Sequence, residues 1–166
     1  SSATINAATF STYFEFRITD PGGTLFDGNS LTGADGLVFV VQSVSSDIGG
    51  AGQGIGYSGI SPSVGVEFDT WHNSYNNDPS SNHIGIDVNG NVDHGAGAPY
   101  TVNVGNDAVR AEGFDNGNIW YSWVDYDGAW LEVRISEDGI RPLDAILSRE
   151  LAIPTILGVS DAYVGF

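Results

Sequence analysis

A short stretch between Glu67 and His83 combines side chains that can bind metal ions. The candidate ligands are Glu67, Asp69, Asn73, Asp78 and His83, together with the backbone carbonyl of Trp71. The first four positions, Trp71 included, are spaced by two, so on an extended strand they project from one face. Oxygen donors suit Ca²⁺, and an added imidazole suits a transition ion such as Mn²⁺. The stretch therefore predicts a site for two cations that share ligands.

Strands must hold these side chains in place, and the hydrophobic pattern predicts two of them, 64–69 and 83–88, on either side of the acidic loop. Further strands are predicted at 10–19, 36–42, 119–126, 129–135 and 161–166, and the Asp127-Gly128 pair between 126 and 129 indicates a hairpin. The glycine-rich residues 49–59 are expected to form a loop, and 144–150 a short helical turn. Many strands with so little helix predict an all-β fold, an antiparallel β-sandwich.

The whole chain of 166 residues fits a single domain over 1–166. Its 5 basic and 21 acidic residues leave a net charge of −16, which argues against nucleic acid or an anionic membrane surface as a partner. We find no 18-residue apolar run, so no membrane span is predicted. The chain opens without a leader sequence, so we expect either a removed signal peptide or a module excised from a longer protein.

Residues 34–39 (ADGLVF), 52–59 (GQGIGYSG), 66–71 (VEFDTW) and 83–89 (HIGIDVN) resemble, in that order, the legume lectins (L-type, concanavalin A-like). The glycine-rich segment and the Trp-His-Asn wording at 71–73 look most like the bacterial members. The resemblance implies a concanavalin A-like jelly roll with some edge strands missing. It implies that the family's strands ahead of residue 10 are lacking, and that strand 161–166 stops without a closing partner.

The resemblance also assigns the metal ligands. It implies that Mn²⁺, or another transition ion, is held by Glu67, Asp69, Asp78 and His83. It implies that Ca²⁺ is held by Asp69, the Trp71 carbonyl, Asn73 and Asp78. Asp69 and Asp78 would bridge the two ions. Two neighbouring cations repel each other, so shared carboxylates between them make electrostatic sense.

A sugar site above the metals follows from the same likeness. Asp35 resembles the family's carboxylate that accepts hydrogen bonds from two sugar hydroxyls, and the peptide before it is implied to be cis. Asn73 would donate its amide N–H to the sugar, and Trp71 would stack on the sugar's apolar face. A backbone N–H of Gln53 or Gly54 would supply a further donor.

These residues predict a non-catalytic, Ca/Mn-dependent carbohydrate-binding lectin module for glycan recognition or adhesion. We expect it to be secreted or at a cell surface, of bacterial type, and to act as a homo-oligomer or within a multi-domain parent. One alternative is a calcium-stiffened structural module of an adhesin, which would not need Asp35 or Trp71. Another is a glycoside hydrolase with a Glu-x-Asp-x-x-Glu strand, but His72 stands where the second glutamate is required.

Two further features have plainer explanations. Residues 87–93 alternate like the start of an EF-hand loop but lack its glycine at the sixth place and its glutamate at the twelfth. A hairpin turn around Asn89-Gly90 accounts for them better. His72 and His94 have no ligand partners at a convincing spacing, so we expect both at the surface.

Overall fold

The computed structural model describes residues 4–20, 33–95, 100–104 and 113–166. The elements of these residues are β1 (Thr4–Asn6), β2 (Phe10–Phe16), β3 (Gly36–Gln42), β4 (Ser63–Asp69), the 3₁₀ turn η1 (Ser74–Asn76), β5 (His83–Val88), β6 (Thr101–Asn103), β7 (Trp120–Tyr126), β8 (Trp130–Ser136), β9 (Leu147–Glu150), α1 (Ile153–Leu157) and β10 (Asp161–Gly165). The helix α1 has five residues, and nothing in the described part of the chain has the length and hydropathy that a membrane-spanning helix requires.

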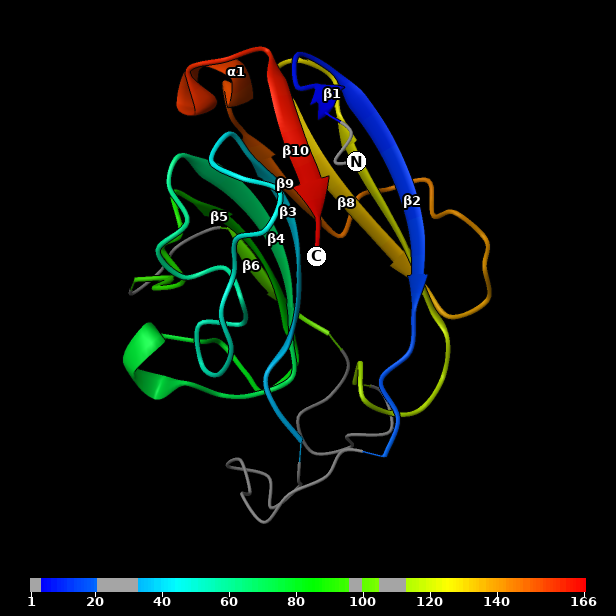
Figure 1. Cartoon of the computed structure of the whole chain (residues 1–166). Helices are drawn as coiled ribbons and strands as arrows, with labels where there is room; N and C mark the ends of the chain where they lie inside the picture. Colours follow the sequence, from blue (N-terminus) through cyan, green and yellow to red (C-terminus); the bar gives the residue numbers. More distant parts are fainter. Residues whose placement is uncertain (1–3, 21–32, 96–99, 105–112) are drawn as a thin grey trace.

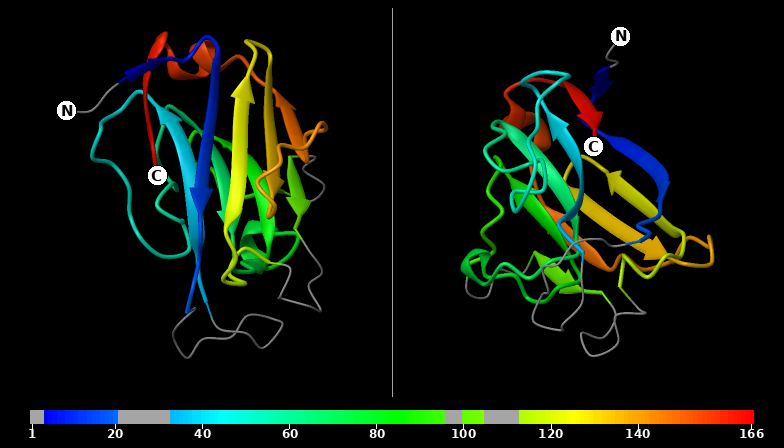
Figure 2. Two further views of the ribbon diagram at one scale, coloured as in Figure 1. Left: turned by 90° about the vertical axis from the view of Figure 1, so that its right-hand side faces the viewer. Right: turned by 60° about the horizontal axis from the view of Figure 1, so that its bottom comes forward.

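The strands form two antiparallel sheets that face each other (Figures 1 and 2). The larger sheet has six strands in the order β1-β10-β3-β4-β5-β6, and the smaller has four in the order β2-β7-β8-β9. In chain order the strands change sheet between β1 and β2, between β2 and β3, between β6 and β7, and between β9 and β10. The predicted all-β, antiparallel sandwich is therefore confirmed.

The core between the sheets is built from alternating apolar side chains. On β2 the residues alternate between half-buried and exposed, as a period of two predicts. Phe14 and Phe16 of this strand contact Phe68 of β4, with ring centroids 5.7 and 5.2 Å away. Phe68 also meets Phe114 edge-on and is fully buried. Successive side chains of a strand point to opposite faces. Because Phe68 faces this aromatic cluster, the acidic residues on either side of it in β4 point to the opposite face of the sheet.

The central strands are covered on their outer face as well. Val38 and Val40 of β3 pack there against Tyr57, which comes from the glycine-rich loop. Gly65 of β4 lies beneath this tyrosine, and a Cβ on it would come within 2.9 Å of the ring. The Tyr57 hydroxyl is bonded to Ser63 Oγ over 3.0 Å. The loop thus closes tightly over the sheet, and the continuous apolar run of β3 is explained by burial on both sides.

Several sequence predictions were wrong at the ends of the sandwich. Residues 144–150 do not form a helical turn, because Leu147–Glu150 is strand β9, whose Leu147 points into the core while its neighbours face solvent. A strand does precede residue 10: β1 pairs with β10. β10 is therefore not left without a closing partner, since β3 pairs with its other edge. A three-residue strand such as β1 is too short to show a hydrophobic period.

Candidate functional site

The acidic side chains lie at one end of the β4–β5 pair, on the face turned away from the aromatic core. Register places Asp69 opposite His83 and Glu67 opposite Gly85. Glu67, Asp69 and His83 are all buried. Gly85 leaves the space that the Glu67 carboxylate occupies, because a Cβ there would collide with it. Pairing between neighbouring strands, rather than proximity in sequence, thus brings His83 to the two carboxylates.

The loop between β4 and β5 is folded back on these strands by hydrogen bonds to the same carboxylates. The Trp71 N–H donates to Asp69 Oδ1 over 2.6 Å, and the Asn73 N–H donates to Asp78 Oδ2 over 2.6 Å. The η1 turn follows Asn73 and ends at Asn77 in the left-handed conformation, with φ of 58°. These contacts return Asp78 to the cluster, as the sequence predicted.

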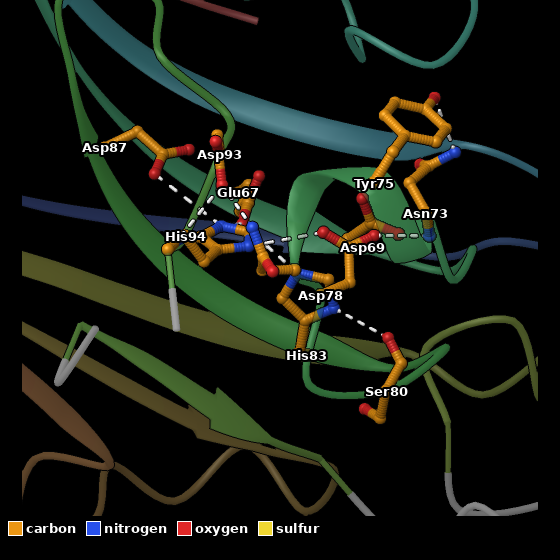
Figure 3. A network of polar contacts seen from close by, with 12 residues as sticks. Glu67, Asp69, Asn73, Tyr75, Asp78, Ser80, His83, Asp87, Asp93 and His94 are labelled. Atoms are coloured by element: carbon orange, nitrogen blue, oxygen red, sulfur yellow. Dashed lines mark hydrogen bonds and ion pairs between the residues drawn. The ribbon is translucent and has the colours of Figure 1, made fainter. Parts of the chain in front are cut away.

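His83 is held in one orientation at the centre of the cluster (Figure 3). Its Nδ1 lies 3.0 Å from the Ser80 carbonyl, and its Nε2 lies 3.2 Å from Glu67 Oε1. A carbonyl can only accept, so Nδ1 carries a proton, and Nε2 donates to the Glu67 carboxylate while His83 is charged. Loss of the Nε2 proton to an incoming metal ion would leave a neutral ring whose Nε2 lone pair faces the cluster. This is the tautomer that a metal-ligating histidine needs.

The electrostatics of the cluster are dominated by burial of acidic groups. Burial raises the pKa of Asp69 to about 8. Burial would also raise the pKa of Glu67, but the hydrogen bond with His83 and the close contacts and charges of His83 and His94 outweigh it and lower that pKa to about 2. The pKa of Asp87 is raised well above its ordinary value by burial and by the nearby Glu67. Several buried carboxylates thus compete for the positive charge of two imidazoles, an arrangement that a bound cation would relieve.

The donor atoms are close enough together to surround metal ions. Within the described residues two groups have ligand atoms that all lie within 4.8 Å of one another: Glu67, His83 and His94 form one, and Asp69, Asp78 and His83 the other. The side-chain oxygen of Asn73 is buried without a hydrogen-bond partner. An unsatisfied buried amide oxygen beside two carboxylates fits a Ca²⁺ ligand, because Ca²⁺ takes oxygen donors of these kinds.

Sequence reasoning misplaced His94 and overlooked Asp87. His94 is not a surface residue: its ring is buried against the cluster, with Nε2 2.5 Å from Glu67 Oε1 and 3.7 Å from Asp87 Oδ1. The predicted turn at Asn89-Gly90 is present, with φ of 57° and 69°, and it directs the following segment back over β5. The placement of His94 depends on that return path, which local spacing does not specify. His72, in contrast, is exposed as predicted.

The residues expected to contact sugar gather beside the metal ligands. Asp35 is half-buried, and its carbonyl accepts the Thr70 N–H over 3.0 Å, next to Asp69. The peptide between Ala34 and Asp35 is cis. Burial raises the pKa of the Asp35 carboxyl. Asp35 is thus placed at the edge of the cluster, directly before strand β3, which pairs with β4.

A tyrosine that the sequence analysis did not single out connects Asn73 to the glycine-rich loop. The Asn73 side-chain amide donates to the Tyr75 hydroxyl over 2.9 Å, and this hydroxyl donates to Gln53 Oε1 over 2.5 Å. The Tyr75 side chain is 58% exposed. Trp71 is partly buried. In the glycine-rich loop the carbonyl of Gly54 closes a turn by accepting the N–H groups of Tyr57 and Ser58. An aromatic residue two positions after Asn73 in an acidic loop was the available signal for Tyr75.

Comparison with known proteins decides the family. The model of the legume lectin domain matches residues 1–166, the whole chain. The chain belongs to the legume lectin domain family. The L-type lectin-domain containing receptor kinase VIII.1 of Arabidopsis thaliana is 35% identical over 164 residues, which cover 95% of this chain and 21% of the kinase. A galactose-binding lectin of Arachis hypogaea is 40% identical over 95 residues, which cover 54% of this chain and 32% of that lectin.

Solved structures of legume lectins share the fold. The acidic lectin of winged bean, complexed with methyl-α-D-galactose, superposes with a TM-score of 0.69 at 25% identity, covering 99% of this chain and 69% of that one. The metal-free form of lectin I-B4 from Griffonia simplicifolia gives a TM-score of 0.66 at 30% identity, covering 98% and 63%. The chain thus spans about a fifth to a third of the curated relatives named above.

Membership of this family indicates general properties of ligand binding, metal binding and location. The lectins among the relatives are non-catalytic carbohydrate-binding proteins, and legume lectins generally bind Ca²⁺ and Mn²⁺. Domains of this family are typically extracellular or lumenal. The two relatives described are plant proteins, so the comparisons do not support the bacterial wording that the sequence resemblance implied.

Proposed function

We propose that residues 1–166 form one carbohydrate-binding lectin module that depends on Ca²⁺ and Mn²⁺ and has no catalytic activity. The observation that carries this proposal is the buried convergence of Glu67, Asp69, Asp78 and His83 beside the unpartnered oxygen of Asn73. Glu67 and His83 would hold the transition ion, the Trp71 carbonyl and Asn73 would hold Ca²⁺, and the two aspartates would be shared.

The metals would serve binding by ordering the loop that carries the sugar contacts. Trp71 and Asn73 lie in that loop, and Asp35 lies at the same end of the sheet, directly before β3. Asp35 would accept hydrogen bonds from sugar hydroxyls, Asn73 would donate one, and Trp71 would stack on an apolar sugar face. Gln53 or Gly54 would add a backbone donor, because Gln53 is already linked to this loop through Tyr75.

A single shallow site of this kind should bind a monosaccharide weakly, with a Kd near 1 mM, or roughly −4 kcal/mol. Useful recognition of a glycan would then rely on several copies, by homo-oligomerisation or within a larger secreted or cell-surface protein. The complex of the winged bean acidic lectin with methyl-α-D-galactose makes galactose derivatives a sensible first probe.

The test is glycan-array binding of the biotinylated chain, assembled on streptavidin so that avidity compensates for weak single sites. Binding should disappear in EDTA and return with Ca²⁺ plus Mn²⁺. Asp35→Asn should weaken binding by about 10- to 100-fold, because a hydrogen bond to a charged group contributes roughly 1.5–3 kcal/mol. Its metal content should stay unchanged, since Asp35 is not among the proposed ligands.

Asp138→Asn is the matched control, because Asp138 is an exposed carboxylate in the loop between β8 and β9. If Asp35→Asn binds glycans as well as this control does, the sugar-site assignment is wrong. If the folded, metal-loaded chain binds no glycan, the structural-module alternative replaces the lectin proposal. Turnover of a β-glucan would favour the hydrolase alternative instead.

A further inference from the structure

His94 is a buried imidazole that the proposed ligand set does not use. It lies in the loop that follows the Asn89-Gly90 turn, and its backbone N–H is tied to the Asn76 carbonyl over 2.8 Å. Its exposed fraction is 7%. The ring meets that of His83 edge-on, with centroids 5.2 Å apart and planes at 88° (Figure 3). Two loops of the metal cluster thus converge on this side chain.

Both ring nitrogens of His94 lie at ion-pair distance from carboxylates, yet neither has a regular hydrogen-bond partner. Nε2 lies 2.5 Å from Glu67 Oε1, and Nδ1 lies 3.2 Å from Asp78 Oδ1, but both nitrogens remain without a hydrogen-bond partner. Asp87 Oδ2 is also buried without one. Buried polar atoms of native proteins are nearly always satisfied, so an unsatisfied imidazole among proposed metal ligands points to a partner of another kind.

We propose that His94 is a direct ligand of the transition ion, so that this site takes Zn²⁺-type ions (Zn²⁺, Co²⁺, Ni²⁺) in preference to Mn²⁺. The inference rests on the proposed function, because it assumes that Glu67 and His83 hold that ion. It adds a second imidazole to the four ligands assigned from the resemblance, and it changes which metal the cluster selects.

The geometry allows one ion to reach all three side chains. Zn²⁺ bonds nitrogen and oxygen at about 2.0–2.2 Å, so two of its ligand atoms are separated by at most about 4.4 Å. The donor atoms of Glu67, His83 and His94 all lie within 4.8 Å of one another, so a shift of at most about 0.4 Å brings them within that limit. The 3.2 Å between His83 Nε2 and Glu67 Oε1 is already typical of neighbouring ligands. The 2.5 Å between His94 Nε2 and Glu67 Oε1 would open by about 0.7 Å to reach the same 3.2 Å spacing around an ion.

The chemistry of the donors sets the metal preference. A carboxylate with two imidazoles matches zinc sites, whereas Mn²⁺ favours sites rich in oxygen. Divalent affinity also rises from Mn²⁺ towards Co²⁺ and Ni²⁺ at a given site. With Nε2 bound to the ion, Nδ1 of His94 would face Oδ1 of the Asp78 carboxylate, which is itself a proposed ligand and would fix the orientation of the ring.

The experiment compares metal binding by the EDTA-stripped chain and its variants. Calorimetric titration with Zn²⁺ and with Mn²⁺ gives affinities, and the visible spectrum of the Co²⁺-loaded chain reports the ligand set. We expect His94→Ala to lower Zn²⁺ affinity at least about tenfold, the loss that even an outer-shell partner causes, and to lower Mn²⁺ affinity much less. The Co²⁺ spectrum should change with it. The control is His72→Ala, which removes the exposed histidine and should match the unaltered chain.

A second variant, His94→Cys, keeps the proposal testable if His94→Ala does not fold. The chain contains no cysteine, so in His94→Cys any thiolate-to-cobalt charge-transfer band in the near-ultraviolet reports a bond at position 94. Such a band supports the proposal. A folded His94→Cys variant without the band, or a His94→Ala variant with the Zn²⁺ affinity and Co²⁺ spectrum of His72→Ala, overturns it. Glycan binding is measured separately, so its absence would count against the proposed function alone.

Discussion

Replacing Gly85 by alanine tests whether the β4–β5 pair is built around the Glu67 carboxylate. Gly85 lies directly opposite Glu67 in the sheet, and the register of the two strands leaves no freedom to slide. A Cβ on Gly85 would overlap Glu67 Oε1 and lie 2.9 Å from its Cδ and 3.0 Å from its Cγ. Carbon atoms in contact prefer about 3.5–4.0 Å, so the Glu67 side chain must withdraw by roughly 0.5–1 Å.

Two consequences follow from that displacement. Overpacking a buried site costs about 1–3 kcal/mol, which for a chain of this size corresponds to a fall in Tm of about 2–12 °C. Metal–ligand distances tolerate only about 0.2 Å, so a displaced carboxylate should also weaken transition-ion binding at least about tenfold. The measurements are thermal unfolding in EDTA, thermal unfolding with saturating Ca²⁺ and Mn²⁺, and calorimetric titration of the metals.

Gly165→Ala is the matched control, since Gly165 also lies in a strand of the larger sheet but an added Cβ would meet no atom within 4 Å. We expect it to leave Tm unchanged or slightly raised, because alanine restricts the unfolded chain. If the clash is the cause, Gly85→Ala should cost less in a chain already carrying Glu67→Ala, a coupling of about 0.5–3 kcal/mol. Equal Tm values and metal affinities for Gly85→Ala and Gly165→Ala would refute the reasoning.

Three further outcomes are expected. Burial raises the pKa of Asp69 to about 8, and contacts with two carboxylates outweigh burial and raise that of His94 to about 10. Both groups hold their protons more tightly in the folded chain than in the unfolded chain, so protonation stabilises the fold. This contribution to the free energy of unfolding is lost between about pH 4 and 8 for Asp69 and between about pH 6.5 and 10 for His94. The Tm in EDTA should therefore fall from pH 5 to 9, while the rise in Tm on adding metals should grow; a metal-free Tm that climbs over this range contradicts the assignment. Phe68→Ala should lower the free energy of unfolding by about 3–5 kcal/mol in urea denaturation, and a loss below about 1 kcal/mol would show that the aromatic core is not organised around it. Tyr57→Phe removes the hydroxyl bonded to Ser63 and should cost about 1 kcal/mol by the same measurement; no loss would mean that this bond does not hold the glycine-rich loop.

The strands that carry the site could be predicted because their signals are local. β3 and β5 were predicted with the observed bounds, and the predicted start of β4 differs by one residue. Alternation along β4 separates Phe68 from Glu67 and Asp69 whatever the rest of the chain does, since strand side chains alternate between faces. The short elements β1, β6 and β9 gave no such signal, because three or four residues cannot display a period.

The metal ligands show the same division between what local sequence signals predict and what they do not. The chain by itself determined that Glu67, Asp69, Asn73, Asp78 and His83 are available as donors within one strand, one loop and the start of the next strand. The tertiary structure alone decided that His94 and Asp87 border the same cluster, that Tyr75 connects Asn73 to Gln53, and that β9 is a strand. The physical reason is that strand periodicity depends on backbone geometry between neighbours in sequence. The return path of a loop depends on which distant surfaces and charges it meets, and no local pattern of residues encodes that choice.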